Sequence, residues 1–200
     1  MPLQDVLDFG TTEPHIIRMP LASGAWVDVA PAWLAEADAL LPALLETVPW
    51  RAERRQMFDN VVDVPRLTTF YAADEVWPHP ALRTICDRLS AHYLPELGEP
   101  LVTAGLCLYR DGRDSVAWHG DRIGRSRYAD TIVAVVSLGA TRTFALRPGG
   151  GGTSLRLVSG HGDLIVMGGS CQRTWEHAIP KTSESVGPRI SVQFRTAGVR

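Results

Sequence analysis

Apolar residues recur at helical spacing in two segments of the first half of the chain, residues 31–46 and residues 81–93. The spacing predicts two amphipathic helices, each with one face turned toward a core. Pro31 suits the start of the first helix, whereas Pro42 should kink or split it. The apolar positions are Trp33, Leu34, Ala37, Leu40, Leu41, Leu44 and Leu45 in the first segment and Leu82, Ile85 and Leu89 in the second, with His92 on the same side.

From about residue 101 the pattern changes to short apolar or β-branched segments separated by Gly, Asp or Pro, which indicates strands. The predicted strands cover residues 101–109, 131–138, 143–147, 154–157, 163–167 and 190–195. The glycine-rich stretch Pro148–Thr153 lies between two of them and predicts the tip of a hairpin rather than a domain boundary. Helices followed by strands predict an α+β chain, an antiparallel β-sandwich or barrel with helices packed outside.

Length and composition exclude several classes of protein. The 200 residues suffice for one domain with a full core, and 45% hydrophobic with 21% charged residues exclude a disordered or collagen-like chain. No apolar run approaches the ~20 residues of a membrane-spanning helix, and the N-terminus carries no secretory signal. We therefore expect a cytoplasmic protein without a membrane partner. Three cysteines without a CxxC spacing predict neither a disulfide framework nor a zinc site.

The charge of the chain limits its mode of binding. A formal net charge of −2 argues against a protein that coats nucleic acid through phosphates alone. Every basic residue except Lys181 is an arginine, which suits bidentate recognition of carboxylate or phosphate. A GC-rich genome would explain the same bias without any function.

A first group of candidate functional residues is the pair His119 and Asp121, two residues apart on an extended segment. Side chains at this spacing point to the same side. With His177 they would supply two histidines and one carboxylate, the facial triad of non-haem Fe(II) oxygenases. The alternative is a surface histidine beside a turn-forming aspartate. His161 competes for the third position, but it lies among glycines before a strand and is interpreted as a turn residue.

A second group follows from the alternation of residues 188–195 near the C-terminus. Arg189 and Arg195 are six residues apart, about 20 Å along a strand. Two inward-pointing guanidinium groups could hold both ends of a short dicarboxylate, and a keto-dicarboxylate would supply the reductant that an Fe(II) oxygenase needs. The alternative is a polar face that meets water. The apolar face consists of Ile190, Val192 and Phe194, and the polar face of Arg189, Ser191, Gln193 and Arg195.

In these motifs the chain resembles the AlkB family of Fe(II)- and 2-oxoglutarate-dependent dioxygenases, the oxidative demethylases of alkylated nucleic acid. The resemblance runs in family order over roughly residues 65–195. The stretches that carry it are Pro65–Tyr71, Leu108–Asp121, Ser137–Phe144, His161–Met167, Trp175–His177 with Pro180–Lys181, and Pro188–Arg195.

The resemblance implies a fold and a division of the chain. It implies a double-stranded β-helix, or jelly roll, with helices packed outside. We expect a single, monomeric domain over residues 1–200. Residues 1–64 would form a helical, substrate-covering part and residues 65–200 the catalytic core.

The resemblance also implies a cofactor, a cosubstrate and the residues that bind them. His119, Asp121 and His177 would be both the catalytic residues and the iron ligands. The 2-oxoglutarate site would comprise Tyr109, Arg189, Ser191 and Arg195. In that site Arg189 would pair with the distal carboxylate, Arg195 would lie near the other end, and Tyr109 would donate a hydrogen bond.

The activity implied by the resemblance is oxidative removal of N-linked methyl groups from alkylated DNA or RNA bases. The reaction would consume Fe(II)-activated O2 and 2-oxoglutarate and release succinate, CO2 and formaldehyde. One alternative is an oxygenase of the same fold acting on a protein side chain or a small metabolite. Another is a non-catalytic nucleic-acid-binding module, which would require a broken metal site.

The resemblance extends less fully to the substrate. Candidate substrate contacts are Phe70, Tyr71, Trp118 and Arg122. A basic cluster formed by Arg51, Arg54 and Arg55 could bind phosphates or could be the solvated face of a helix.

At four places the chain departs from the family pattern. Arg122 and Ile123 follow the metal aspartate where relatives often carry acidic residues, and Cys107 stands where an asparagine is common. Ser191 and Gln193 replace the usual Asn and Thr. These changes leave the triad and both arginines intact, so they bear on the preferred base rather than on the oxygenase chemistry.

Overall fold

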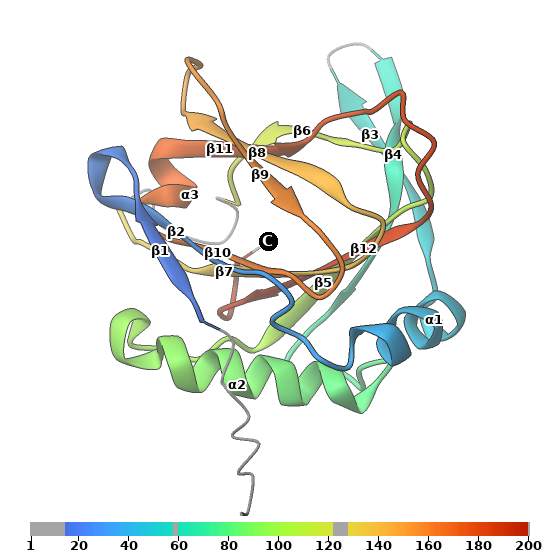
Figure 1. Ribbon diagram of the computed structural model, residues 1–200, viewed down its shortest axis with the longest axis horizontal. Helices are drawn as coiled ribbons and strands as arrows, with labels where there is room; N and C mark the ends of the chain where they lie inside the picture. The colour runs from blue at the N-terminus through green and yellow to red at the C-terminus, as the bar shows by residue number, and fades with distance from the viewer. Residues whose placement is uncertain (1–14, 58–59, 122–127, 200) are drawn as a thin grey trace, which may run out of the picture.

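Two antiparallel β-sheets face each other in the computed structural model of the chain, which describes residues 15–57, 60–121 and 128–199 (Figure 1). Within these residues the larger sheet has eight strands and the smaller has four. In spatial order the larger sheet consists of β1 (Ile17–Pro20), β2 (Ala25–Ala30), β10 (Leu164–Gly169), β7 (Val133–Gly139), β12 (Arg189–Arg195), β5 (Thr103–Tyr109), β4 (Asn60–Tyr71) and β3 (Arg51–Met57). The smaller consists of β6 (Val116–His119), β11 (Trp175–Ile179), β8 (Arg142–Pro148) and β9 (Leu155–Ser159).

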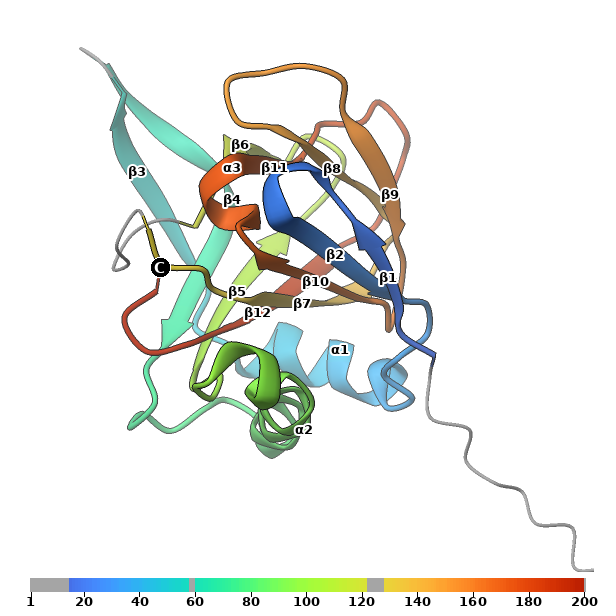
Figure 2. The same ribbon diagram turned by 90° about the vertical axis from the view of Figure 1, so that its left-hand side faces the viewer.

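Two long helices cover the outer face of the larger sheet. These are α1 (Ala37–Thr47) and α2 (Pro80–Leu97), which Figures 1 and 2 both show on the side away from the smaller sheet. The short elements η1 (Ala22–Gly24) and α3 (Cys171–Thr174) lie in connections. The architecture is the predicted one, an α+β chain with a jelly-roll core and helices outside. No helix among the described residues is long and apolar enough to cross a membrane.

The larger sheet separates two apolar cores. One lies between the sheet and the helices and includes Leu82 and Leu89 of α2 and Phe194 of β12. The other lies between the two sheets and includes Val135 of β7 and Leu146 of β8. Because successive strand residues point to opposite faces, each strand of the larger sheet contributes to both cores, and polar residues facing the second core line a cavity there.

Helix α2 has clear local signals at both ends. Pro80 occupies its first turn, and the His79 ring accepts a hydrogen bond from the Ala81 amide at 3.2 Å. At the other end Gly98 adopts a left-handed conformation (φ 76°) that ends the helix. These signals explain why the predicted helix over residues 81–93 is confirmed and extends in both directions.

The first helix differs from its prediction in two respects. It begins at Ala37 rather than near residue 31, because the preceding segment is tied to the turn before β10: the Leu34 amide donates to the Gly162 carbonyl at 2.9 Å. It also continues through Pro42, which faces solvent while Leu40 and Leu44 anchor the buried side. Packing therefore outweighs the cost of the proline.

The prediction that residues 1–64 are helical is wrong for most of the described part. Besides α1, this part contains β1, β2, β3 and the beginning of β4, and β4 crosses the expected boundary at residue 64. Strand β2 is an interior strand, paired with β1 on one side and β10 on the other. Its polar residue, Asp28, is 1% exposed and accepts hydrogen bonds from Arg18 (2.7 and 2.8 Å) and the Tyr93 hydroxyl (3.0 Å).

The strands predicted beyond residue 101 are confirmed with shifts of one or two residues at their ends. Strands β8 and β9 pair as a hairpin, with the glycine-rich stretch at its tip. The three cysteines, Cys86, Cys107 and Cys171, are buried free thiols, as the absence of CxxC spacing predicts.

Candidate metal and cosubstrate site

A cavity of about 270 Å³ lies between the two sheets. Residues from both sheets line it, so its polar groups converge from strands that are distant in the sequence. Its lining consists of Arg66, Cys107, Tyr109, Val116, His119, Gly120, Asp121, Val133, Val135, Phe144, His177, Ile179, Ser191, Gln193 and Arg195.

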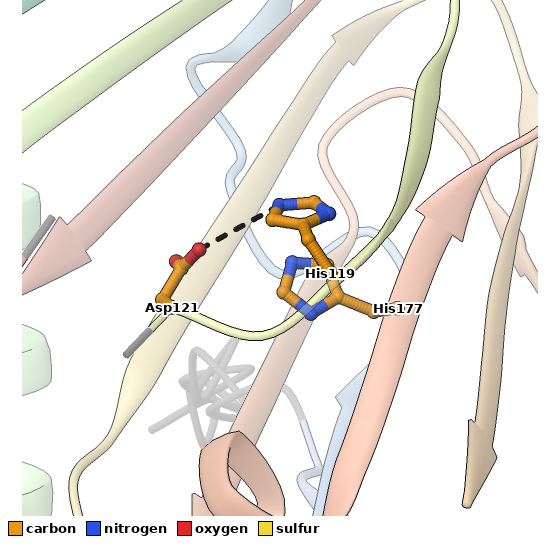
Figure 3. Close-up of side chains that lie close together, drawn as sticks. All are labelled: His119, Asp121 and His177. Carbon is orange, nitrogen blue, oxygen red and sulfur yellow. Dashed lines mark ion pairs between the residues drawn. The ribbon is translucent and has the colours of Figure 1, made fainter. Parts of the chain in front are cut away.

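His119, Asp121 and His177 meet at one end of this cavity (Figure 3). Strands β6 and β11 are antiparallel neighbours in which His177 stands directly opposite His119. One ligand atom from each of the three residues lies within 4.8 Å of the other two. Among the described residues this is the one group of His, Cys, Asp or Glu that could hold a metal ion. The triad predicted from the sequence is confirmed as a metal-binding arrangement.

The orientation of His119 leaves its Nε2 for a metal. The Nδ1 lies 2.8 Å from the Ala117 carbonyl oxygen, so Nδ1 carries the proton and donates it there. The opposite ring nitrogen, Nε2, faces Asp121 Oδ1 at 3.6 Å. A backbone carbonyl thus fixes both the tautomer and the direction of the imidazole.

His177 is held in its neutral, metal-binding form. Its ring is buried and stacks on Phe144 with ring centroids 5.5 Å apart. Burial and the neighbouring His119 lower the pKa of His177 to about 3. A neutral imidazole has a free lone pair, which metal binding requires.

The two carboxylate oxygens of Asp121 have different surroundings. Oδ2 accepts hydrogen bonds from Arg195 Nε and Nη2 at 2.8 and 2.6 Å, whereas Oδ1 faces His119. Burial alone would raise the pKa of this carboxyl, but Arg195 and the two histidines lower it below its ordinary value. The Gln172 side chain also accepts a hydrogen bond from the Asp121 amide at 2.9 Å. Asp121 is therefore an ionised, rigid ligand.

Arg195 has a partner that the sequence interpretation did not include. Two of its donors, Nε and Nη2, bind Asp121. The nearest buried carboxylate attracts this guanidinium, and the pair shields both charges from the apolar surroundings. Arg195 thus belongs to the metal end of the cavity, which we define as the triad together with Arg195.

Arg189 provides a buried cationic site beside the cavity-lining Tyr109. It is 1% exposed, and its Nη2 donates to the hydroxyls of Ser137 and Ser159 at 2.8 and 3.2 Å. Its Nε and Nη1 are buried and have no partner among the residues that the structure describes. An unpaired buried cation is costly, and burial lowers the pKa of Arg189. A carboxylate ligand at these two nitrogens would offset that cost, so the arginine fits a dicarboxylate such as 2-oxoglutarate.

Tyr109 and Ser191 line the cavity next to Arg189, Tyr109 on the neighbouring strand and Ser191 two residues further along β12. Tyr109 stands opposite Arg189 in the β5–β12 pair, and the guanidinium lies 5.3 Å from the centre of its ring. Burial raises the pKa of Tyr109, so its phenol is a donor at neutral pH. Ser191 presents its hydroxyl to the same cavity. We call Tyr109 and Ser191, which line the cavity, together with the adjacent Arg189 the cosubstrate end of the cavity.

The structure does not bring the predicted substrate residues together. Trp118 precedes His119 and faces the opposite side of the smaller sheet, with the Arg147 guanidinium 4.3 Å from its ring. Tyr71 packs against the core beneath the helices. Both placements follow from strand alternation, which turns Trp118 away from His119 and Tyr71 away from Phe70.

The remaining substrate candidates are less fully placed. Phe70 points to the cavity side of β4, opposite Gly105, but is not part of the lining. Arg122 lies outside the described residues, as do the side chains of Arg54 and Arg55. Arg51 begins a strand, so the helical interpretation of this cluster is wrong.

Arg66 is a cavity residue that the sequence interpretation missed. It lies on β4 and lines the cavity, and its Nε is buried without a partner among the described residues. Its pKa is raised: burial lowers it, but the proximity of Cys107 and Tyr109 more than compensates. The sequence offers one signal for this position. Alternation along Pro65–Tyr71 places Arg66 on the same face as Phe70.

His161 is a turn residue, as predicted, and lies apart from the triad. Its Nδ1 accepts a hydrogen bond from the Gly139 amide at 2.8 Å, and its Nε2 lies 3.1 Å from Asp38. Both ring nitrogens therefore tie the turn before β10 to its surroundings.

Comparison with known proteins agrees with this geometry. The model of the 2OG-Fe(II) oxygenase superfamily matches residues 28–195. The chain is 33% identical to "Alpha-ketoglutarate-dependent dioxygenase alkB homolog 3" of Homo sapiens over 217 residues, covering 96% of this chain and 71% of the relative. It is 26% identical to "DNA oxidative demethylase ALKBH2" of Homo sapiens over 181 residues, covering 80% and 69%.

Solved structures share the fold at lower identity. An oxidoreductase of the 2OG-Fe(II) oxygenase family from Burkholderia pseudomallei superposes with a TM-score of 0.59 at 17% identity, covering 85% of this chain and 84% of the other. With the triad and the buried arginines in place, these matches establish that the chain belongs to the AlkB family and is an Fe(II)- and 2-oxoglutarate-dependent dioxygenase.

Proposed function

We propose that the protein is an oxidative demethylase that removes N-linked methyl groups from alkylated bases of DNA or RNA. The observation that carries the proposal is a cavity lined by a facial triad and by Tyr109, with the buried Arg189 next to Tyr109 and two of its nitrogens without a partner among the described residues. The names of the relatives, one of them a DNA oxidative demethylase, favour a nucleic-acid substrate. We further propose that it acts as a cytoplasmic monomer.

In this proposal different residues of the chain bind the metal and the cosubstrate. His119, Asp121 and His177 would hold Fe(II), which with 2-oxoglutarate and O2 supplies the oxidising power when bound. Arg189 would pair with one carboxylate of 2-oxoglutarate through Nε and Nη1, its two unpartnered nitrogens. Tyr109 and Ser191 would donate hydrogen bonds along the same molecule. Oxidation of an N-methyl carbon releases it as formaldehyde and restores the base.

The cavity walls would control water and access. Val133, Val135, Phe144 and Ile179 give the cavity an apolar lining beside the triad, which excludes water from the reacting carbon. A base must leave its stack to reach such an interior site, and this costs least in a single strand or at a mispair. We therefore expect single-stranded substrates to be processed faster than paired ones.

The test is turnover with Fe(II), ascorbate and 2-oxoglutarate on single- and double-stranded oligonucleotides that carry 1-methyladenine or 3-methylcytosine. Mass spectrometry should show loss of the methyl group by the wild type and none by His119→Ala. Succinate formed without demethylation of any strand would reject a nucleic-acid substrate. It would favour the alternative, an oxygenase of the same fold acting on a protein side chain or a small metabolite.

A further inference from the structure

One side chain, Gln193, links the metal end of the cavity to the cosubstrate end. Its Nε2 donates a hydrogen bond to the Ser191 hydroxyl at 2.7 Å. Its Oε1 accepts from Arg195 Nη2 at 3.5 Å and from the Cys107 thiol at 3.8 Å. Arg195 in turn holds the metal ligand Asp121. The glutamine therefore contacts one residue at each end of the cavity, and itself lies in the cavity wall.

The space for this arrangement comes from a glycine on the neighbouring strand. Gly105 of β5 stands directly opposite Gln193 of β12. A Cβ at Gly105 would lie 2.8 Å from Arg195 Nη1 and 3.1 Å from Gln193 Oε1. Both distances are shorter than the ~3.5 Å at which non-bonded heavy atoms pack. A glycine within a regular strand marks a place where another group approaches the backbone closely, and here that group is the Arg195 guanidinium.

We propose that Gln193 is a positioning residue. It holds Arg195 against Asp121, in the space that Gly105 leaves free, and it holds the Ser191 hydroxyl toward the cosubstrate. One amide side chain would then support both metal binding and 2-oxoglutarate binding. Gln193 acts through its neighbours, since its hydrogen bonds go to Ser191, Arg195 and Cys107 and not to the triad. The proposal concerns the oxygenase centre and holds for any substrate.

Binding measurements without turnover test the proposal. Mn(II), which takes the same oxygen and nitrogen ligands without oxidation, is titrated into the metal-free protein by calorimetry, and 2-oxoglutarate is then titrated into the Mn(II)-loaded protein. Gln193→Leu keeps the side-chain volume and removes both polar atoms. We expect both dissociation constants to rise about tenfold, the lower end of what changes around metal ligands cost, while the melting temperature stays close to that of the wild type.

A pair of glycine variants tests the role of the bare backbone. In Gly105→Ala the new methyl group displaces Arg195 and Gln193, and we expect Mn(II) binding to weaken about tenfold. The matched control is Gly187→Ala, because a Cβ at Gly187 meets nothing within 4 Å. The control should bind Mn(II) as the wild type does. Should Gly105→Ala fail to fold, Gln193→Leu alone decides.

Two results would overturn the proposal. One is a Gln193→Leu protein that melts at a lower temperature but binds Mn(II) and 2-oxoglutarate within about twofold of the wild type, which would make Gln193 a packing residue. The other is a folded Gly105→Ala protein that binds Mn(II) as tightly as Gly187→Ala.

Discussion

At the scale of single residues, Asp121 shows how a buried ion pair can set the number of bonds to a metal. Both contacts from Arg195 go to Oδ2, so Oδ1 is the oxygen that remains toward His119 and His177. A carboxylate with one oxygen engaged in this way binds a metal through the other. With Arg195 on Oδ2, Asp121 would offer a bound Fe(II) only Oδ1, together with the two histidines.

Arg189→Met should separate binding from stability. The guanidinium is buried with two unpartnered nitrogens, so an apolar side chain of similar length removes a desolvated charge. Ser137 and Ser159 stay satisfied because their hydroxyls hydrogen-bond to each other at 2.6 Å. We expect the ligand-free protein to gain about 1 kcal/mol in free energy of unfolding and 2-oxoglutarate affinity to fall about 100-fold.

Urea unfolding and calorimetric titration measure these two effects. Arg156→Met, an exposed change on β9, is the control for the loss of one positive charge. A loss of stability in Arg189→Met with unchanged 2-oxoglutarate affinity would place the cosubstrate elsewhere.

His177 should make the metal-free protein sensitive to acid. Burial and His119 lower its pKa from 6.5 to about 3. Below pH 6.5 the His177 side chain is therefore protonated in the unfolded chain but stays neutral in the folded chain. The free energy of unfolding therefore falls as the pH drops from about 6.5 toward about 3. The urea concentration at the unfolding midpoint should fall more between about pH 7 and about pH 5 in the wild type than in His177→Gln. An equal fall in both proteins would contradict this assignment.

At the scale of elements, the parts that the sequence predicts are those whose signals are local. The alternation of residues 189–195 predicts that Ser191, Gln193 and Arg195 of β12 reach the cavity, and these three side chains line it. Strand β2 escapes prediction because Asp28 interrupts its apolar run, and its partners Arg18 and Tyr93 lie outside the strand. Likewise, the Arg195–Asp121 pair joins two motifs 74 residues apart, which no local pattern reveals.

Gly168→Ala should destabilise the packing between strands β2 and β10, where the N-terminal strands join the rest of the larger sheet. Gly168 lies on β10 opposite Trp26 of β2, and a Cβ there would lie 2.0 Å from Cζ2 of the indole ring. Overpacking of this kind costs about 1–3 kcal/mol, or a melting temperature lower by about 2–12 °C for a chain of this size. Thermal melts should show this loss against Gly187→Ala, and equal melting of the two variants would contradict it.

At the scale of the whole molecule, the metal ligands His119 and His177 lie on the smaller sheet and Asp121 lies just beyond its strand β6, whereas the cosubstrate arginine lies on the larger sheet. Ligands bound between them should therefore stabilise the folded chain as a unit. At 100 times its dissociation constant, a ligand adds about 2.7 kcal/mol. We expect Mn(II) with 2-oxoglutarate to raise the melting temperature of the wild type and not of His119→Ala, and an equal rise in both would show that the ions bind elsewhere.

The place of β2 within the larger sheet has a consequence for synthesis of the protein on the ribosome. Val29 of β2 pairs with Ile165 of β10, so this strand must wait for a partner that is translated 165 − 29 = 136 residues later. At typical elongation rates the wait is on the order of ten seconds. During that time an apolar strand, Ala25–Ala30, has one edge unpaired. The nascent chain therefore needs chaperone protection of this strand until β10 has been made, by which time His119 and Asp121 have been translated but His177 has not.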